Sequence, residues 1–181
     1  MPIYTKKGDK GETGLFTSNK NGPKRLSKDS LRIEVIGAID EVNSVLGVAK
    51  SFVSDPKIIK TITNLQKDLF ITASIIAGSN LSFSSSKVKR LEQAIDEWDK
   101  RLPRVSNFII PGGSQAGALI FYARAMSRRA ERRAVSLNKV EKLRPVTLKF
   151  LNRVSDYLWM LSRQVNSSEG FGEEIWMGRR T

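Results

Sequence analysis

The sequence predicts an all-α protein, a bundle of five helices preceded by an N-terminal arm, and three observations support this prediction. From Ser30 onward, apolar residues recur at spacings of three and four residues, as they do on one face of a helix. No stretch alternates apolar and polar residues in the way that a half-buried strand does. The 181 residues are 40% hydrophobic, which is enough for one well-filled core and short for two domains. We therefore expect a single domain over residues 1–181.

The first two helices of the bundle are each expected to span about 20 residues. Their apolar stripes are Val35, Ile39, Val42 and Leu46 in the first helix and Ile58, Ile62, Leu65 and Leu69 in the second. A third, shorter helix is expected from about Ser86, after a cluster of serines, to about Leu102, before Pro103.

Two more helices complete the predicted bundle. The Pro-Gly-Gly sequence at 111–113 interrupts the chain, and Ser114 can cap a fourth helix that runs to about Leu137. The fifth helix has the clearest period, with Pro145 in its first turn, where a proline is tolerated. Its stripe is Leu151, Val154, Leu158, Leu161 and Val165. Such long, narrow stripes favour helices that pack at shallow angles.

Residues 1–29 do not follow the helical pattern, and we treat them as an N-terminal arm that precedes the bundle (30–166) and a C-terminal tail (167–181). The segment from Thr5 to Gly14 is rich in glycine, lysine and threonine, so its amides and cations can wrap a polyphosphate. Lys28 can add a positive charge to the same site. A mobile tail is the more common behaviour of such a terminus. Composition alone leaves both interpretations open.

Composition excludes several classes of chemistry. The chain has no cysteine and no histidine, which removes disulfides, thiolate or imidazole metal sites and histidine-dependent triads from consideration. The net charge of +13 indicates either an anionic partner or a lysine-rich solvated surface. No apolar run approaches the roughly 20 residues of a membrane helix, and the first residues lack the apolar stretch of a signal peptide. We expect a cytoplasmic protein with no membrane partner.

The first predicted helix carries a second line of residues beside its apolar stripe. Asp40, Asn43 and Gly47 follow one another at spacings of three and four, so a carboxylate and an amide border the buried face. A solvated helix edge explains this pattern. A close contact with another helix or with a ligand explains it equally well, because a glycine such as Gly47 weakens a helix but lets another group approach closely.

The fourth predicted helix carries a cluster of arginines. Arg124, Arg128 and Arg132 recur at intervals of four residues, and like charges at this spacing repel one another unless an anion lies across them. Arginine suits phosphate, because its planar fork donates two parallel hydrogen bonds. A solvated basic face and a nucleic-acid-binding face are the alternatives.

Taken together in order, five segments give the chain a resemblance to the PduO-type ATP:cob(I)alamin adenosyltransferases. The segments are residues 5–14, 37–47, 108–113, 123–133 and 152–156. The resemblance covers nearly the whole chain, and five segments in the same order are far more specific than any one of them. It implies a five-helix bundle that assembles as a homotrimer with active sites between subunits. It also implies transfer of the adenosyl group of ATP to the cobalt of cobalamin.

The resemblance further implies roles for particular residues. The positions that match ATP-binding residues of the family are Thr5, Lys6, Lys7, Gly8, Thr13, Gly14 and Lys28 in the arm, and Arg128, Arg129, Glu131, Arg132 and Asn152 in the bundle. Asp40 matches an acidic residue that pairs with the equivalent of Arg128 across the subunit interface. Phe108 matches a cobalamin-binding aromatic that lies against the corrin and helps displace its lower axial base. Arg128, Asp40 and Phe108 are thus the expected catalytic residues.

The implied mechanism needs no histidine, because the nucleophile is Co(I) of the substrate corrinoid, which attacks the 5′ carbon of ATP while triphosphate departs. The protein aligns the reacting groups and stabilises charge on the phosphates with Mg²⁺, lysines and arginines. ATP, Mg²⁺ and cobalamin are the expected ligands, and no side chain is assigned as a metal ligand. A flavoprotein reductase and an adenosylcobalamin-dependent acceptor enzyme are the expected transient partners.

Two rival interpretations use the same residues. A non-enzymatic nucleic-acid-binding bundle would use the arginine face and the arm as phosphate contacts, but it would not require Asp40, Asn43 or the segment at 108–113. A structural trimer without activity would keep only the fold, and the intact arm and arginine cluster argue against it. The resemblance favours an enzyme with no nucleic-acid partner. Adenosylation of cob(I)alamin distinguishes it from both rivals.

Overall fold

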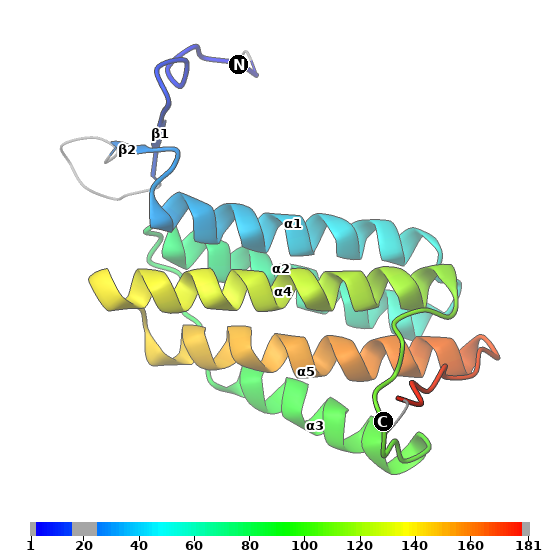
Figure 1. Cartoon of the computed structure of the whole chain (residues 1–181). Coiled ribbons are helices and arrows are strands. Elements are labelled where there is room, and N and C mark those ends of the chain that lie inside the picture. Colours follow the sequence, from blue (N-terminus) through cyan, green and yellow to red (C-terminus); the bar gives the residue numbers. More distant parts are fainter. Residues whose placement is uncertain (1–2, 16–24, 179–181) are drawn as a thin grey trace.

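The computed structural model describes residues 3–15 and 25–178, and it contains all the predicted helices (Figure 1). They are α1 (Leu31–Ser51), α2 (Pro56–Ile76), α3 (Ser86–Arg101), α4 (Gln115–Val140) and α5 (Pro145–Ser168). The prediction of a five-helix fold is confirmed. α4 continues beyond the expected end at Leu137, because neither glycine nor proline follows that residue before Val140.

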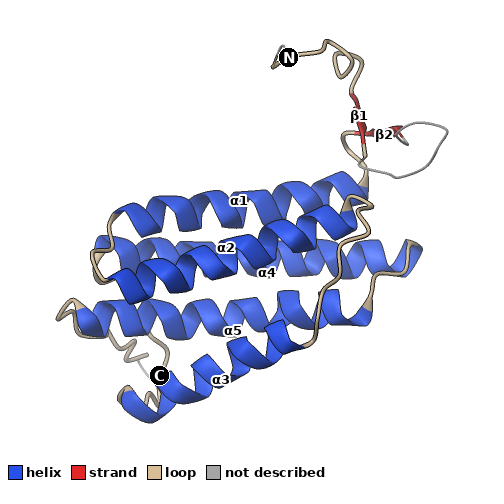
Figure 2. Cartoon of the chain, turned by 180° about the vertical axis from the view of Figure 1, so that it is seen from behind, coloured by secondary structure: helices blue, strands red, loops and turns tan. Residues whose placement is uncertain are grey.

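The helices pack in a bundle with α4 between α1 and α5. α2 packs against α1, and α3 packs against α5, which is visible from both sides in Figures 1 and 2. Ion pairs join Glu41 to Arg129 and Glu34 to Arg133, so α1 and α4 run in opposite directions. The predicted stripes meet in one core, whose fully buried members include Ile39, Leu46, Ile62, Leu69, Ile120, Phe150, Leu158 and Leu161. None of the helices in the described part of the chain combines the length and the apolar character that crossing a bilayer requires.

Local sequence explains where the helices begin. The Asp55 carboxylate accepts a hydrogen bond of 2.7 Å from the Lys57 amide at the start of α2. The Ser114 hydroxyl accepts one of 3.0 Å from the Gly117 amide at the start of α4. Pro145 occupies the first turn of α5, where its missing N–H is not needed. The predicted helix starts at Ser114 and Pro145 are therefore confirmed.

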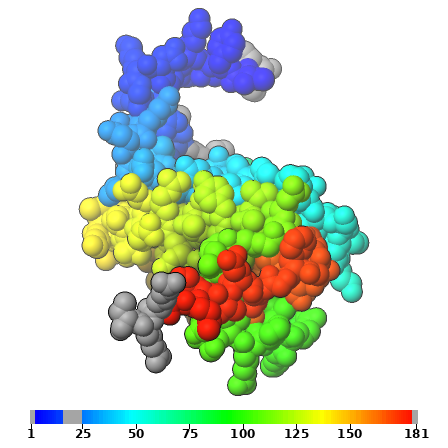
Figure 3. Space-filling view, turned by 45° about the vertical axis from the view of Figure 1, so that its right-hand side comes forward, coloured from blue at the N-terminus to red at the C-terminus, as the bar shows by residue number. Residues whose placement is uncertain are grey.

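The arm is folded in the residues that the structure describes. β1 (Glu12–Gly14) and β2 (Arg25–Ser27) pair in antiparallel fashion, with Thr13 opposite Leu26. The expectation that no stretch forms a sheet is wrong for these two strands, because segments of three residues are too short to show an alternating pattern. In Figure 3 the arm (blue) rises from the bundle and curves over open space.

The segment after α5 folds back on the loop between α3 and α4. Ile175 forms an antiparallel bridge with Ile109, and the Trp176 amide donates a hydrogen bond of 2.8 Å to the Phe108 carbonyl. Figure 3 shows these C-terminal residues (red) lying against the green surface formed by the middle of the chain. The described part of the expected C-terminal tail, up to residue 178, is therefore paired with the loop between α3 and α4.

Candidate active site

The arm brings Lys28 onto the glycine-rich turn, as the sequence predicted. Lys28 Nζ donates a hydrogen bond of 3.0 Å to the Gly8 carbonyl, and the Lys28 amide donates one of 2.8 Å to the Gly11 carbonyl. A Cβ on Gly8 would lie 3.2 Å from Lys28 Nζ, so glycine permits this close approach. Lys6 and Gly11 have positive φ angles of 57° and 80° and bracket the turn. The turn thus gathers an ammonium group and several backbone amides in one place.

The other arm residues of the predicted site adjoin this turn. Thr5, Lys6 and Lys7 precede it and are exposed, whereas Thr13 and Gly14 follow it in β1. Sequence reasoning did not single out Arg25, which supports the turn from β2. The Arg25 guanidinium donates a hydrogen bond of 2.6 Å to the Lys7 carbonyl and pairs with the Glu12 carboxylate at 3.0 Å.

Two of the predicted ATP-binding residues, Glu131 and Asn152, meet where α4 faces α5, and Arg128 lies nearby on α4. The Asn152 amide donates a hydrogen bond of 2.7 Å to the Glu131 carboxylate, which joins the two helices. Arg128 is exposed and lies one helical turn from the half-buried Arg124. Burial lowers the pKa of the Arg124 guanidinium, and the positive charge of Arg128 lowers it further, while the Asp156 carboxylate acts in the opposite direction. Two guanidinium groups, an amide and two carboxylates therefore share one edge of the bundle.

The remaining arginines of α4 divide between the opposite edge and the exposed surface. Arg129 pairs with Glu41, and Arg133 pairs with Glu34 at 3.5 Å, so both face α1. Within residues 3–15 and 25–178, neither Arg128 nor Arg132 has an ion-pair partner. The arginine cluster is therefore not one uniform solvated face.

Asp40 and Arg128 do not meet within the chain. Asp40 shares a face of α1 with Asn43 and Gly47, and this face borders α2, since Gln66 donates a hydrogen bond of 3.0 Å to the Asn43 carbonyl. Gly47 permits the close helix contact, because a Cβ there would lie 3.5 Å from Gln66. Arg128 instead lies on the α5 side of α4. The Asn43 side-chain oxygen is buried and accepts no hydrogen bond from any described residue.

An open cavity of about 890 Å³ lies between α3, α4, α5 and the α3–α4 loop. Its apolar lining comprises Ile95, Phe108, Ile109, Pro111, Phe121, Trp159 and Met160. Its charged lining consists of two arginines and four carboxylates, which are Arg124, Arg153, Glu92, Asp96, Asp99 and Asp156. Phe108 stands at the rim with 79% of its surface exposed, and it also lines a second hollow beside Trp176. The cavity therefore has an aromatic wall and a charged side, and Arg124 on that side lies one helical turn from Arg128.

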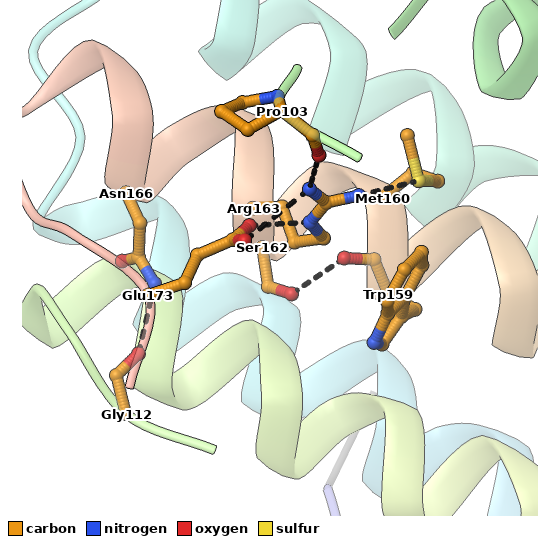
Figure 4. Close-up of polar contacts among 8 residues, drawn as sticks. All are labelled: Pro103, Gly112, Trp159, Met160, Ser162, Arg163, Asn166 and Glu173. Carbon is orange, nitrogen blue, oxygen red and sulfur yellow. Dashed lines mark hydrogen bonds and ion pairs between the residues drawn. The ribbon is translucent and has the colours of Figure 1, made fainter. Parts of the chain in front are cut away.

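Asn166 of α5 holds the part of the α3–α4 loop that leads into α4. The buried Asn166 accepts a hydrogen bond of 3.0 Å from the Ser114 amide and donates one of 2.9 Å to the Gly112 carbonyl. Figure 4 shows the bond between Asn166 and Gly112. Gly117 permits this arrangement, because a Cβ there would lie 2.6 Å from Asn166 Cγ. The glycines at 113 and 117 thus leave room for Asn166 beside the cavity, because a Cβ at either position would clash with its amide.

Arg124 and Asp156 line this cavity, although the sequence analysis named Arg124 only as a member of the arginine cluster and did not single out Asp156. Asp156 follows Asn152 by one helical turn, and this spacing is the signal that could have identified it. Arg124 precedes Arg128 by the same spacing. Asn166 carried no such signal, because its partners lie on the other side of a loop.

The arm and Phe108 lie at opposite ends of the bundle. The arm joins the start of α1, whereas the Phe108 loop joins the start of α4, which runs antiparallel to α1 (Figure 1). α1 has 21 residues, so the two ends are separated by about 30 Å at 1.5 Å per residue. Within one chain, the structure does not bring the arm residues of the predicted site to Phe108.

Known proteins resemble this chain over nearly its whole length. Residues 3–165 match the family model described as cobalamin adenosyltransferase. A corrinoid adenosyltransferase from Bacillus subtilis is 38% identical over 181 residues, covering 96% of this chain and 91% of that protein. The corrinoid adenosyltransferase PduO from Citrobacter freundii is 36% identical over 170 residues; the match covers 90% of this chain but only 49% of that protein.

A solved structure has the same fold as this chain. It is a variant of a PduO-type ATP:corrinoid adenosyltransferase from Lactobacillus reuteri complexed with cobalamin and ATP. It matches this chain with a TM-score of 0.90 at 31% identity, covering 98% of this chain and 100% of that chain. The family match, the sequence identities and the common fold agree: the chain belongs to the cobalamin adenosyltransferase family.

Proposed function

We propose that this protein transfers the 5′-deoxyadenosyl group of ATP to cob(I)alamin, giving adenosylcobalamin and triphosphate. The observation that carries the proposal is the cavity of about 890 Å³, whose lining combines an apolar wall at Phe108 with the guanidinium groups of Arg124 and Arg153. Its volume lies in the upper part of the range of small-molecule sites. The cavity thus offers apolar surface for a macrocycle, and Arg128, one helical turn beyond Arg124 on α4, would offer a cationic group for the phosphates. The Lactobacillus reuteri relative was solved with both cobalamin and ATP, which supports the same pair of substrates here.

ATP would be held from two sides. The arm would wrap the triphosphate with its amides and with Thr5, Lys6, Lys7, Gly8, Thr13, Gly14 and Lys28. The bundle would contribute Arg128, Arg129, Glu131, Arg132 and Asn152. Arg128 has no partner among the described residues, so its guanidinium is available to the developing charge on the departing triphosphate. Arg129 is already paired with Glu41, and this ion pair fixes its position on α4.

Phe108 would bind the corrin, which is the second of the two reacting substrates. Its exposed ring can lie against the macrocycle and exclude both water and the lower axial base, which favours the reduced form of cobalt. Co(I) of the substrate supplies the nucleophile, and the chain's own residues align it with C5′ of ATP. No histidine or cysteine takes part, because the chain contains neither.

Mg²⁺ would enter the site with ATP. Among the residues that the structure describes, no group of three or more acidic side chains could hold a metal ion. The phosphates are therefore the natural ligands, and the chain would meet the magnesium complex of ATP through Lys28 and the arginines.

The active site would be shared between chains in a homotrimer. The separation of about 30 Å between the arm and Phe108 supports this assembly, because one chain cannot place both ends on the same pair of reacting atoms. Asp40 and Arg128 face different neighbours within the chain, and a contact with a second chain would unite them across the interface. Sedimentation of the protein at about three times the chain mass of 20.3 kDa tests this part of the proposal.

The three segments of the chain would have separate roles within one functional unit. Residues 1–29 would contribute the ATP-binding arm, 30–166 the bundle, and 167–181 a C-terminal segment that supports the Phe108 loop. In the cytoplasm, a flavoprotein reductase would supply the electron that produces cob(I)alamin, and an adenosylcobalamin-dependent enzyme would accept the product.

The nucleic-acid-binding alternative is not favoured by the geometry. Arg129 and Arg133 are paired with glutamates, and Arg124 is half-buried beside the cavity. The glutamates partly neutralise the charge of the exposed Arg129 and Arg133, whereas a nucleic-acid surface would leave such cations free for successive phosphates.

The deciding experiment mixes the protein with Mg-ATP and chemically reduced cob(I)alamin while the corrinoid absorption spectrum is recorded. We expect adenosylcobalamin and triphosphate in equal amounts. Omission of ATP is the control. Formation of no adenosylcobalamin by correctly folded protein would contradict the proposed function.

A further inference from the structure

A buried arginine ties together two segments that lie far apart in the sequence. The Arg163 side chain on α5 is 2% exposed, and its guanidinium forms an ion pair with Glu173, beyond the end of α5. One of its terminal nitrogens donates a hydrogen bond of 2.6 Å to the carbonyl of Pro103, at the start of the α3–α4 loop. Figure 4 shows both partners converging on the guanidinium, which also lies 4.7 Å from the centre of the Trp159 ring.

Both segments continue into the short ribbon that carries Phe108. The Phe108 carbonyl accepts a hydrogen bond of 2.8 Å from the Trp176 amide, and the Ile110 amide donates one of 2.8 Å to the Glu174 carbonyl. Glu174 directly follows the Glu173 that Arg163 holds. The backbone at Phe108 is therefore placed by the C-terminal segment, and Arg163 anchors that segment to the bundle.

The Phe108 ring depends on this anchor because little else holds it. Its side chain is 79% exposed, so packing within the chain contributes few contacts. Trp159 and Met160, which both contact Arg163, line the same cavity as Phe108. Arg163 therefore lies directly behind the wall of the proposed corrin site.

An ion pair at this position is better suited to fixing geometry than to adding stability. Desolvation offsets most of the attraction between buried charges, and an apolar side chain of similar size often stabilises a core as well. The planar guanidinium fork, in contrast, accepts only a narrow range of positions for the Glu173 carboxylate and the Pro103 carbonyl. We propose that Arg163 is a positioning residue, which holds Phe108 against the corrin by fixing the C-terminal segment and the α3–α4 loop. This inference rests on the proposed function.

A double-mutant cycle tests the inference, because a residue that acts through Phe108 loses its effect once the Phe108 ring is removed. Phe108→Ala, Arg163→Met and the double variant are assayed from cob(II)alamin with a weak reductant and Mg-ATP. We expect each single substitution to lower turnover about tenfold or more, and the double variant to match Phe108→Ala within about twofold. Two effects that multiply would overturn the inference, since Arg163 would then act independently of Phe108.

Further measurements separate positioning from a general loss of structure. In Arg163→Met, the affinity for ATP and the turnover from chemically reduced cob(I)alamin should stay within about twofold of the unsubstituted protein. Amide exchange at Ile110 and Trp176 should become faster, because their hydrogen bonds join the two segments. Loss of ATP binding together with activity, or unchanged exchange at both amides, would count against the inference. If Arg163→Met does not fold, Glu173→Gln takes its place in the cycle under the same criteria.

Arg101→Lys is the matched control, because Arg101 pairs with Glu97 on the exposed surface of α3 and should leave every readout unchanged. The two proposals fail in different ways. An unsubstituted protein that cannot adenosylate cob(I)alamin contradicts the proposed function. An active protein whose turnover from cob(II)alamin survives Arg163→Met contradicts only the role of Arg163.

Discussion

Two glycine-to-alanine substitutions should change stability in opposite directions. Gly117 lies in the first turn of α4 against Asn166, and a Cβ there would lie 2.6 Å from Asn166 Cγ and closer still to its side-chain oxygen. Gly117→Ala therefore forces the Asn166 amide to move. Gly37 lies inside α1, and a Cβ there meets no atom within 4 Å. Gly37→Ala therefore only removes a weak helix former.

The magnitudes follow from the contacts at each site. Asn166 accepts hydrogen bonds from the Ser114 amide at 3.0 Å and the Ser114 hydroxyl at 3.2 Å, and donates one to Gly112 at 2.9 Å. Losing these three bonds costs about 3 kcal/mol at about 1 kcal/mol each. The better helix propensity of alanine offsets at most about 1 kcal/mol of this cost. Gly117→Ala should therefore lower the free energy of unfolding by about 2 kcal/mol. Gly37→Ala should raise it by about 0.5 to 1 kcal/mol.

Thermal denaturation followed by circular dichroism measures both effects. For a chain of this size, about 2 kcal/mol corresponds to a fall in Tm of roughly 4 to 8 °C for Gly117→Ala, and the gain at Gly37 to a rise of roughly 1 to 4 °C. Protein concentration must be the same in all samples, because subunit association also changes Tm. A Gly117→Ala protein as stable as Gly37→Ala would refute the reasoning, since the loop beside the cavity would then not depend on Asn166.

Three further predictions concern the site itself. Amide exchange across residues 5–28 should slow when Mg-ATP binds, because the amides of the arm enclose the triphosphate, and unchanged exchange at saturating ATP would contradict this assignment. Phe108→Ala should abolish most turnover from cob(II)alamin while ATP binding persists, whereas an equal loss in both assays would make Phe108 a packing residue. Arg128→Lys should cost about 2 to 4 kcal/mol of transition-state stabilisation, or roughly 30- to 1000-fold in turnover, because lysine keeps the charge but loses the fork. Arg133→Lys, which faces Glu34 on the other edge of α4, is its control, and an equal loss in both variants would indicate diffuse positive charge.

The helices could be predicted from the sequence because their causes are local. The stripe from Leu151 to Val165 repeats within one segment, and Pro145 marks its start without reference to any other part of the chain. The sequence also indicated that Lys28 can add its charge near the glycine-rich segment, but it did not predict the hydrogen bond from Lys28 to the Gly8 carbonyl.

Contacts between distant segments could not be predicted in the same way. Arg163 and Glu173 are two charged residues near the end of the chain, and no spacing rule connects either of them to Pro103. Periodicity places Asp40 and Arg128 on the edges of their helices, but it does not say which neighbour each edge meets. That choice depends on how five helices pack, which is a property of the whole core.

In the homotrimer proposed above, each chain would contribute to two active sites and complete neither alone, because the arm and the Phe108 loop leave the bundle at opposite ends. A protein with a defective arm would be inactive, and so would a protein with a defective Phe108 loop. Each would still supply the part of the active site that the other lacks. If equal amounts of the two were unfolded and reassembled together, about a quarter of the interfaces in the mixed trimers would unite an intact arm with an intact loop. Complementation between two inactive chains would thus restore activity that neither chain shows by itself.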